Sequence, residues 1–145
     1  FGLTEADFGS NPGGMKTRAT RDGDSYLVNG SKILITNGDI ADFLVVTAVT
    51  TPGQGMRGLS LIIVDRDSPG FAARRLQTMG KRAAHTAELS FQDCRVHADH
   101  LLGEENTGFA SAMRTLTEGR VIAAAVPLVD RRLFSCPHRV YPTIR

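Results

Sequence analysis

The chain has 145 residues, of which 41% are hydrophobic and 22% are charged. This balance is ordinary for a folded protein and excludes a chain that is disordered throughout, because enough apolar surface is present to offset the entropy lost on folding. No apolar run approaches the roughly 18–20 residues of a membrane-spanning helix, and the first residues lack the basic start and apolar stretch of a signal peptide. We therefore expect no membrane partner. Because the first residue is not Met, we expect a processed chain or a fragment.

The formal net charge of +2 is unevenly distributed along the chain. Residues 127–145 carry four arginines against a single acid, Asp130, so the rest of the chain is close to neutral. No basic stripe interleaved with aromatic residues runs through that part, and we therefore expect no nucleic-acid partner. The two cysteines, Cys94 and Cys136, form no CxxC motif and are too few for a disulfide framework. This favours a reducing compartment, with Cys94 as a small buried apolar residue.

Turn signals occur at short intervals in the first half of the chain, for example Asp22-Gly23 and Pro52-Gly53. The runs between them are rich in β-branched and apolar residues, and runs of this length between turn residues predict strands. The expected strands include residues 26–28, 33–35, 43–49 and 59–64, with a later one around residues 87–91. The Asn29-Gly30 pair stands between two of these runs and predicts a type I′ hairpin, since both turn positions need a positive φ.

Two of these runs differ in how much surface they should bury. Leu59 to Val64 is nearly all apolar, so it should lie in a core. Ala87, Leu89 and Phe91 alternate with polar residues, so this strand should bury only one face. Together these patterns predict one mainly β domain over residues 1–102, either a barrel or a sandwich.

The pattern changes to helical spacing in the last third of the chain. Apolar residues recur at this spacing between Phe109 and Ala123, which predicts one helix from about Thr107 to about Val126. The chain offers no partner for its apolar face, so we expect the helix to belong to a helical domain that is mostly missing. Residues 127–145 hold three of the six prolines, and Pro127 should end the helix. They predict an irregular, poorly ordered tail.

Two charged residues of this helix attract attention. Arg120 falls on the apolar stripe, where a guanidinium needs an anion or a buried acid, unless it reaches solvent at the edge of the stripe. Both alternatives stay open. Glu118 could be proposed as a catalytic base, but it faces away from the stripe with Arg114 four residues before it, which favours a solvated charge pair.

Two other groups of residues are weaker candidates for a site. His97 and His100 lie three residues apart after a strand, with no third ligand in view, so no metal site is predicted. The loop from Gly9 to Gly14 could form a backbone nest for an anion, but its spacing matches neither a P-loop nor a dinucleotide fingerprint. A glycine-rich surface loop is the favoured interpretation.

Four segments, in order and in register, resemble the acyl-CoA dehydrogenase family. They are FGLTEADFGS at residues 1–10, NGSKILITNG at 29–38, the segment at 58–71, and MGKRAAHTAELSFQDCRV at 79–96. LLGEENTGF and the helix that follows continue the match to about residue 125. The resemblance implies the middle β domain of a flavoprotein that normally has three domains. Residues 103–126 would then be the first helix of a truncated carboxy-terminal bundle.

The resemblance also implies a reaction. In this family a carboxylate removes the α-proton of an acyl-CoA while the β-hydride passes to N5 of FAD, and the product is a trans-2-enoyl-CoA. Electrons leave through an electron-transfer flavoprotein. The usual base lies downstream of this chain, so no catalytic residue is assigned here and the chain alone should be inactive. The full-length protein would be a homotetramer of the bacterial cytoplasm or the mitochondrial matrix.

Site residues follow from the resemblance position by position. The positions that match the family's flavin contacts are Phe1, Leu3, Thr4, Gly9, Ser10, Leu34, Ile35 and Thr36. The positions that match its substrate contacts are Ser10, Thr117, Glu118, Gly119 and Arg120. Thr36 would place its hydroxyl beside the reactive edge of the flavin, where a donor stabilises developing negative charge.

This sequence departs from the family pattern at several of these positions. Leu34 stands where the family usually has Trp or Phe, Thr117 replaces a common Asp, and Ala84 replaces a common Ser. Two alternatives to a dehydrogenase therefore stay open: a non-catalytic β module that binds flavin or CoA, and a related oxidase-like flavoprotein that uses oxygen or binds nucleic acid. The near-neutral charge of residues 1–126 counts against nucleic acid.

Overall fold

The computed structural model describes residues 1–134, and for residues 126–134 only the backbone. The chain divides into two compact units, Phe1–Ala110 and Ser111–Arg145. Among the described residues, no helix combines the length and the apolar character that crossing a membrane would require.

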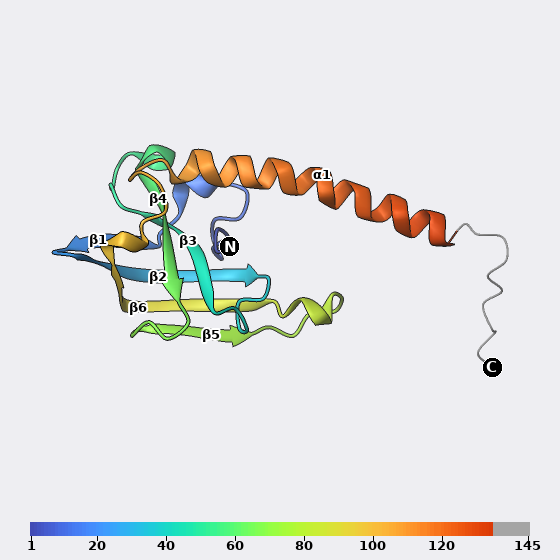
Figure 1. Ribbon diagram of the computed structural model, residues 1–145, viewed down its shortest axis with the longest axis horizontal. Coiled ribbons are helices and arrows are strands. Elements are labelled where there is room, and N and C mark those ends of the chain that lie inside the picture. The colour runs from blue at the N-terminus through green and yellow to red at the C-terminus, as the bar shows by residue number, and fades with distance from the viewer. Residues whose placement is uncertain (135–145) are drawn as a thin grey trace. The chain divides into compact units, whose positions relative to one another are not determined.

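The first unit is built on one six-stranded sheet (Figure 1). Its strands are β1 (Arg18–Asp22), β2 (Ser25–Ile35), β3 (Phe43–Val49), β4 (Leu59–Asp65), β5 (Phe71–Arg75) and β6 (Ala87–His97). Short 3-10 helices are η1 (Pro12–Gly14), η2 (Gly55–Gly58), η3 (Arg82–Ala84) and η4 (Ala98–His100). The strand order is β4-β3-β1-β2-β6-β5, and every pair is antiparallel except β1 with β3.

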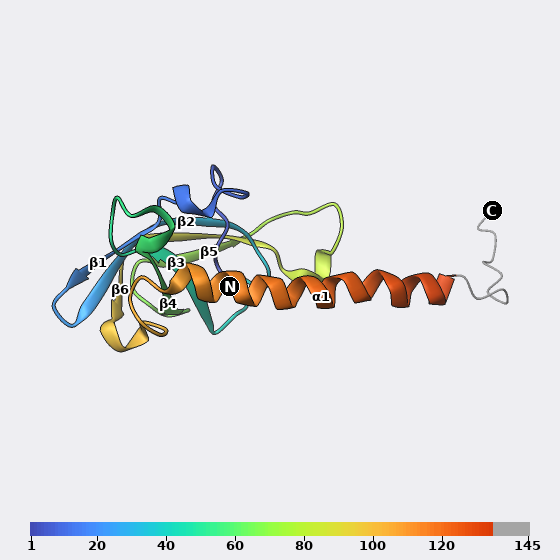
Figure 2. The same ribbon diagram turned by 90° about the horizontal axis from the view of Figure 1, so that it is seen from above.

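The sheet is an open half-barrel, a single curved sheet that comes nearer to the predicted barrel than to the predicted sandwich. It ends at β4 on one side and at β5 on the other, so it neither closes on itself nor divides into two sheets. One long helix, α1 (Gly108–Phe134), follows the strands. The prediction of a mainly β fold followed by a single helix is confirmed. Seen from above, residues 5–14 stand out from the sheet as a loop (dark blue in Figure 2).

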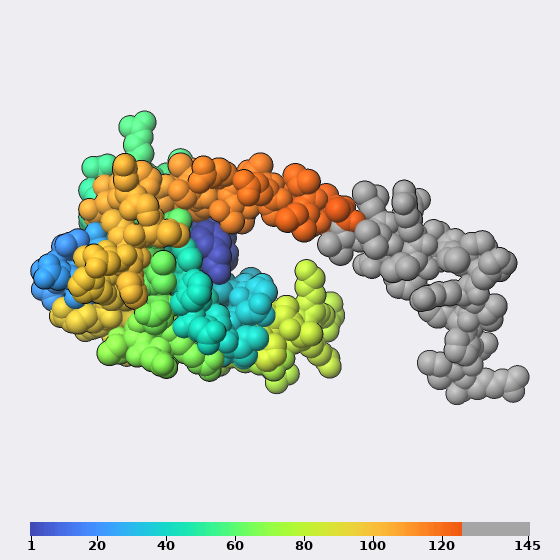
Figure 3. All heavy atoms as spheres, in the orientation of Figure 1, coloured from blue at the N-terminus to red at the C-terminus, as the bar shows by residue number. Residues whose placement is uncertain are grey.

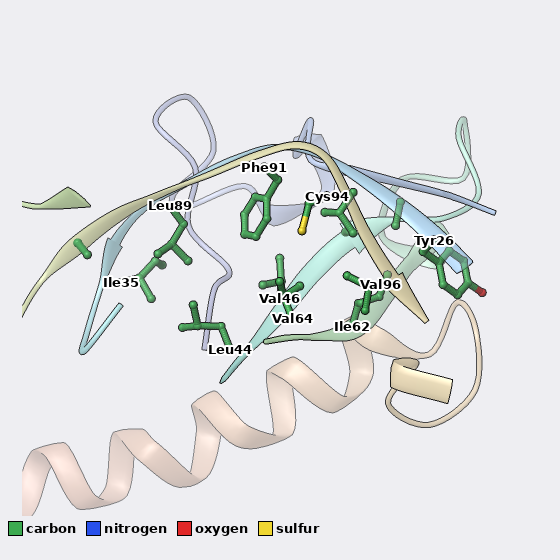
Figure 4. Close-up of a cluster of buried hydrophobic side chains, with 14 residues drawn as sticks. Tyr26, Ile35, Leu44, Val46, Ile62, Val64, Leu89, Phe91, Cys94 and Val96 are labelled. Atoms are coloured by element: carbon green, nitrogen blue, oxygen red, sulfur yellow. The ribbon is translucent and has the colours of Figure 1, made fainter. Parts of the chain in front are cut away.

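Apolar side chains from five strands fill the concave face of this sheet (Figure 4). Five of the six residues from Leu59 to Val64 are buried, and Ala87, Leu89 and Phe91 are buried while the residues between them are not, as their patterns predict. Cys94 is fully buried among them, and this burial raises the pKa of its thiol to about 11. An unreactive thiol in the core is the expected outcome.

The predicted hairpin at Asn29-Gly30 is wrong. β2 runs without interruption through both residues, and the β1–β2 turn lies instead at Gly23-Asp24. The strand needs glycine at position 30 for close approach, because a Cβ there would lie 2.6 Å from Oγ1 of Thr17. Opposite Asn29 the partner strand β6 carries one extra residue, and Asp93 adopts a φ of +46° there. The Asn-Gly pair thus marks a β-bulge rather than a turn.

Two strands are not predicted by the apolar pattern. β1 and β5 have the sequences RATRD and FAARR, and most of their side chains are exposed. β1 pairs along its whole length with β2, and β5 does so with β6. Main-chain pairing with a well-anchored neighbour therefore forms these strands, and their side chains give no alternating signal.

The helix is present but longer than predicted. It continues past Pro127 to Phe134, so the prediction of irregular structure is wrong for residues 127–134. A proline removes one main-chain hydrogen bond of a helix without preventing helical dihedrals on both sides of it. Residues 135–145, which include Cys136, lie outside the described residues.

Replacing Gly30 by alanine should destabilise the sheet. Gly30 has a φ of +141° and almost touches Thr17, so the new Cβ adds a steric clash to an unfavourable backbone conformation. We expect a loss of about 1–3 kcal/mol in the free energy of unfolding, measured by chemical denaturation. Gly53→Ala is the matched control, because Gly53 has a φ of +83° and open space around its Cα. Equal losses in both variants would contradict the proposed close approach.

Candidate functional site

The first residues of the chain lie in the sheet, between β3 and the end of β2. Gly2 donates its N–H to the carbonyl of Val45 at 2.8 Å and accepts from the N–H of Thr47 at 3.0 Å. On the other side, the N–H of Ile33 donates to the carbonyl of Thr4 at 2.9 Å. The segment that carries Leu3 and Thr4 is therefore held alongside the segment that ends in Thr36.

A buried ion pair fixes this arrangement. Nζ of Lys32 lies 2.9 Å from Oε1 of Glu5 and donates to the carbonyl of Leu3 at 3.2 Å. Lys32 is fully buried, and only 7% of the Glu5 side chain is exposed. The Glu5 carboxylate also accepts from the main-chain N–H of Lys16 at 2.6 Å and of Thr17 at 2.9 Å.

The hydrogen bonds keep Glu5 ionised despite its burial. Burial by itself raises the pKa of Glu5, but the hydrogen bonds from Lys16, Thr17 and Lys32 prevail and hold the pKa below its ordinary value. A carboxylate that accepts this many bonds is stabilised in its charged form. The pair therefore acts as an ion pair inside the domain.

Glu5 and Lys32 have no role predicted from the sequence, although both lie in the segments that carry the family resemblance. One signal was available. Lys32 has the same parity along β2 as Tyr26 and Val28, whose side chains point into the core. A lysine on a buried face needs an acidic partner, but nothing in the sequence identifies which of the fifteen acidic residues supplies it.

A second bulge turns Leu34 away from the core. Lys32 pairs with Leu89 and Ile35 with Ala87, so β2 carries one residue more than β6 in this interval. Leu34 takes a φ of +60°, which is uncommon for a residue with a Cβ, and 60% of its side chain is exposed. Its exposure is a consequence of the bulge, because strict alternation would place it on the same side as Lys32.

The other predicted flavin positions are distributed around this place. Phe1 is 40% exposed, and Ile35 is buried, so Ile35 can meet a ligand only through its main chain. Thr36 is exposed, and among the described residues its hydroxyl has no hydrogen-bond partner. Gly9 lies near Thr4, since a Cβ on Gly9 would be 4.0 Å from the Thr4 side chain, and Ser10 follows it on the exposed loop.

The glycine-rich loop does not form an anion nest. A nest requires alternating right- and left-handed backbone conformations, whereas Gly9, Gly13 and Gly14 have no positive φ. Phe8 packs against the loop, because a Cβ on Gly14 would lie 2.3 Å from the Phe8 ring. The favoured interpretation as a surface loop agrees with this geometry.

The predicted substrate positions Thr117, Glu118, Gly119 and Arg120 lie in α1, in the second unit, and all four are exposed. No acid among the described residues is within ion-pair distance of Arg120, and none of the ion pairs there joins Arg114 to Glu118. Both side chains of that proposed charge pair are solvated.

The residues near Leu34 suit one side of a flavin. A flat ring system needs apolar contacts on its face and hydrogen-bond donors at its edge. Leu34 offers an exposed apolar side chain, and Thr36, directly after the same strand, offers a hydroxyl that bonds to no protein group within the described part of the chain. The ion pair between Glu5 and Lys32 holds the neighbouring main chain in place.

Removing one member of the ion pair should be costly. We expect Lys32→Met to lower the free energy of unfolding by about 3–5 kcal/mol, because it leaves the Glu5 carboxylate buried without its counter-charge. The matched control is Lys16→Met, which breaks the exposed Lys16–Asp7 pair with side chains 72% and 67% exposed. Exposed pairs contribute about 0–1 kcal/mol. Urea denaturation measures both, and similar small losses would show that the buried pair does not hold the domain together.

Comparison with known proteins identifies the family. Residues 1–94 match the family model described as acyl-CoA dehydrogenase, middle domain. Cyclohex-1-ene-1-carbonyl-CoA dehydrogenase of Geobacter metallireducens is 45% identical over 84% of this chain and 32% of its own length. The structure of butyryl-CoA dehydrogenase from Megasphaera elsdenii is 39% identical with a TM-score of 0.87, covering 99% of this chain and 40% of that one.

A chain in a structure of the electron transferring flavoprotein of Acidaminococcus fermentans is also similar. It is 46% identical with a TM-score of 0.81, and the match covers 83% of this chain and 32% of that one. The chain described here thus spans about a third of the length of these relatives. The match to the family model over most of the chain shows that the chain belongs to the acyl-CoA dehydrogenase family.

Proposed function

We propose that this chain is the flavin-binding middle part of an FAD-dependent acyl-CoA dehydrogenase, with the start of a helical domain attached. The observation that carries the proposal is the junction of two segments. The carbonyls of Leu3 and Thr4 accept hydrogen bonds from β2, the strand that leads to Leu34 and Thr36. Both segments match positions that contact the flavin in the family. FAD, when bound, supplies the acceptor for a hydride from the acyl β-carbon.

In this proposal the chain binds and orients. Phe1 and Leu34 contribute apolar contact, the main chain at Leu3, Thr4 and Ile35 gives polar contacts, and the Thr36 hydroxyl donates to the reactive edge of the ring. Such a donor favours negative charge that develops there. Gly9 and Ser10 lie on the side of the flavin phosphate and the substrate's pantetheine.

The substrate in this proposal is an acyl-CoA thioester, and the product is a trans-2-enoyl-CoA. Arg120 and its neighbours Thr117, Glu118 and Gly119 help to place the substrate. The carboxylate that removes the α-proton comes from another part of the complete protein. The names of the two dehydrogenases reported above, both acting on CoA thioesters, support this substrate class.

Electron transfer and assembly complete the proposal. The similarity to a chain in an electron transferring flavoprotein structure supports a partner of that kind as the electron acceptor. We further propose a homotetramer of the complete protein, located in the bacterial cytoplasm or the mitochondrial matrix. The alternatives are an oxidase-like flavoprotein, which would reduce oxygen, and a β module that binds flavin or CoA without catalysis.

A domain exchange tests the proposed function. Residues 1–125 would replace the corresponding segment of Megasphaera elsdenii butyryl-CoA dehydrogenase, and we expect the product to bind FAD and to reduce a dye with butyryl-CoA. The 145-residue chain alone should show no activity, because loss of a general base costs about 10²–10⁴-fold and loss of positioning costs more. Hydrogen peroxide release would favour the oxidase. Activity of the chain alone that Glu118→Gln abolishes would instead make Glu118 the base.

Thr36→Val in the exchanged protein removes one donor and keeps the side-chain shape. A hydrogen bond to a charged group contributes about 1.5–3 kcal/mol, so flavin reduction should slow by about ten- to a hundredfold. The dissociation constant of the acyl-CoA should change little, because the proposed pantetheine contacts lie on the loop of Gly9 and Ser10. Rapid-mixing absorbance at the flavin band measures the reduction step. An unchanged rate would show that Thr36 does not face the reactive edge.

A further inference from the structure

Unfavourable backbone conformations gather on two segments of the first unit that meet in space. Four of the six described non-glycine residues with positive φ lie on them: Leu34 and Asn37 around the end of β2, and Lys81 and His85 on either side of η3. Left-handed conformations are disfavoured for residues with a Cβ, and they persist only where surrounding contacts enforce them. The segment between β5 and β6, which contains η3, projects from the sheet (yellow-green in Figure 3).

Two contacts join these segments. The N–H of Asn37 donates to the carbonyl of Ala84 at 2.9 Å, and Nδ1 of His85 lies 3.2 Å from Oδ2 of Asp39. Side-chain exposure is 30% for His85 and 18% for Asp39, so water competes only weakly for this contact. Thr36 lies one residue before Asn37, the first of the two residues of this segment that make these contacts.

Asp39 depends on its cationic neighbours. Its second carboxylate oxygen, Oδ1, is buried and has no hydrogen-bond partner among the described residues. Burial raises the pKa of Asp39, but the hydrogen bonds from His85 and from the main chain of Asp39 itself, together with the nearby charge of Arg75, hold the pKa below its ordinary value. When only one oxygen of a carboxylate accepts hydrogen bonds, a charged donor at that oxygen stabilises the carboxylate strongly.

Two arginines from different parts of the sheet lie around this contact. Arg75 of β5 donates to the carbonyl of Arg82 in η3 at 2.8 Å. Arg66, which follows β4, lines a cavity of about 130 Å³ together with Asp39. Both arginines stay charged over the whole accessible pH range, whereas an imidazole can be neutral or protonated.

We propose that Asp39 and His85 form a positioning pair for Thr36, which holds the turn after β2 more firmly when His85 is protonated. Protonation makes Nδ1 a charged donor to the Asp39 carboxylate, and charge-assisted hydrogen bonds are shorter and stronger than neutral ones. The tie restrains Asn37 and hence the orientation of Thr36. The effect of this pair on flavin reduction rests on the proposed function. The coupling between the protonation of His85 and the turn at Thr36 and Asn37 does not depend on a flavin.

Nuclear magnetic resonance on the 145-residue chain tests the coupling without a flavin. We expect the main-chain amide signals of Thr36 and Asn37 to move with pH and with the same midpoint as the ring signals of His85. Asp39→Asn should abolish this movement while the chain stays folded. His97→Gln is the matched control, because His97 also pairs with an aspartate, Asp99 at 3.3 Å, but both side chains are exposed. Movement should persist in that variant.

The outcomes separate this proposal from the proposed function. If the amide signals of Thr36 in the wild-type chain do not move with the ring signals of His85, the proposed positioning pair is wrong. It is also wrong if these amide signals still move with the same midpoint in Asp39→Asn. In the exchanged protein, the rate of flavin reduction should depend on pH through His85, and Asp39→Asn should remove that dependence. If the exchanged protein does not bind flavin, the proposed function is contradicted, and the nuclear magnetic resonance result on the 145-residue chain is unaffected.

Discussion

The buried ion pair between Glu5 and Lys32 is the constraint on which the candidate site depends. Taking both charges out of water costs several kcal/mol for each ion. The buried pair is tolerated because both charged groups form hydrogen bonds within the protein that replace those with water. The ammonium has the carboxylate and the Leu3 carbonyl, and the carboxylate has two main-chain N–H groups as well. The geometry of this pair restricts where the first five residues can lie, because it ties both Glu5 and the Leu3 carbonyl to Lys32.

Several features of the site follow from this anchoring. β1 pairs with β3 at a single position, Arg18 with Val49. Beyond that position, the first residues of the chain lie between β3 and β2 and bond to both strands. With Lys32 held inward, the bulge that follows turns Leu34 outward and returns Ile35 to the core. One strand thus changes which of its residues face the interior within four positions. A bulge of this kind re-aims a side chain without breaking the sheet.

Prediction from sequence succeeded where local pattern and burial agree. The continuous apolar run of β4 and the alternation over residues 87–91 of β6 both appear as predicted, because each of these stretches is regular strand with a constant environment on each face. Prediction failed where a residue serves a distant contact. Gly30 looks like a turn residue but makes room for Thr17, which is thirteen positions earlier. The partnership of Glu5 and Lys32 spans 27 residues, and no local pattern encodes it.

The candidate site shows the same division between local and distant causes. The family resemblance identified individual positions such as Leu3 and Thr36, but not the contacts that set their geometry. Tyr26 and Val28, on the core side of β2, belong to the apolar core, and neither has a positive φ. Residues at the end of β2 combine exposed side chains with left-handed backbone, and such conformations persist only when other segments enforce them. The pairing with β6 sets the bulge at Leu34, and the Ala84 carbonyl in the loop before β6 accepts the N–H of Asn37. We therefore expect a substitution in that loop to alter the turn after β2 without contacting the candidate flavin positions.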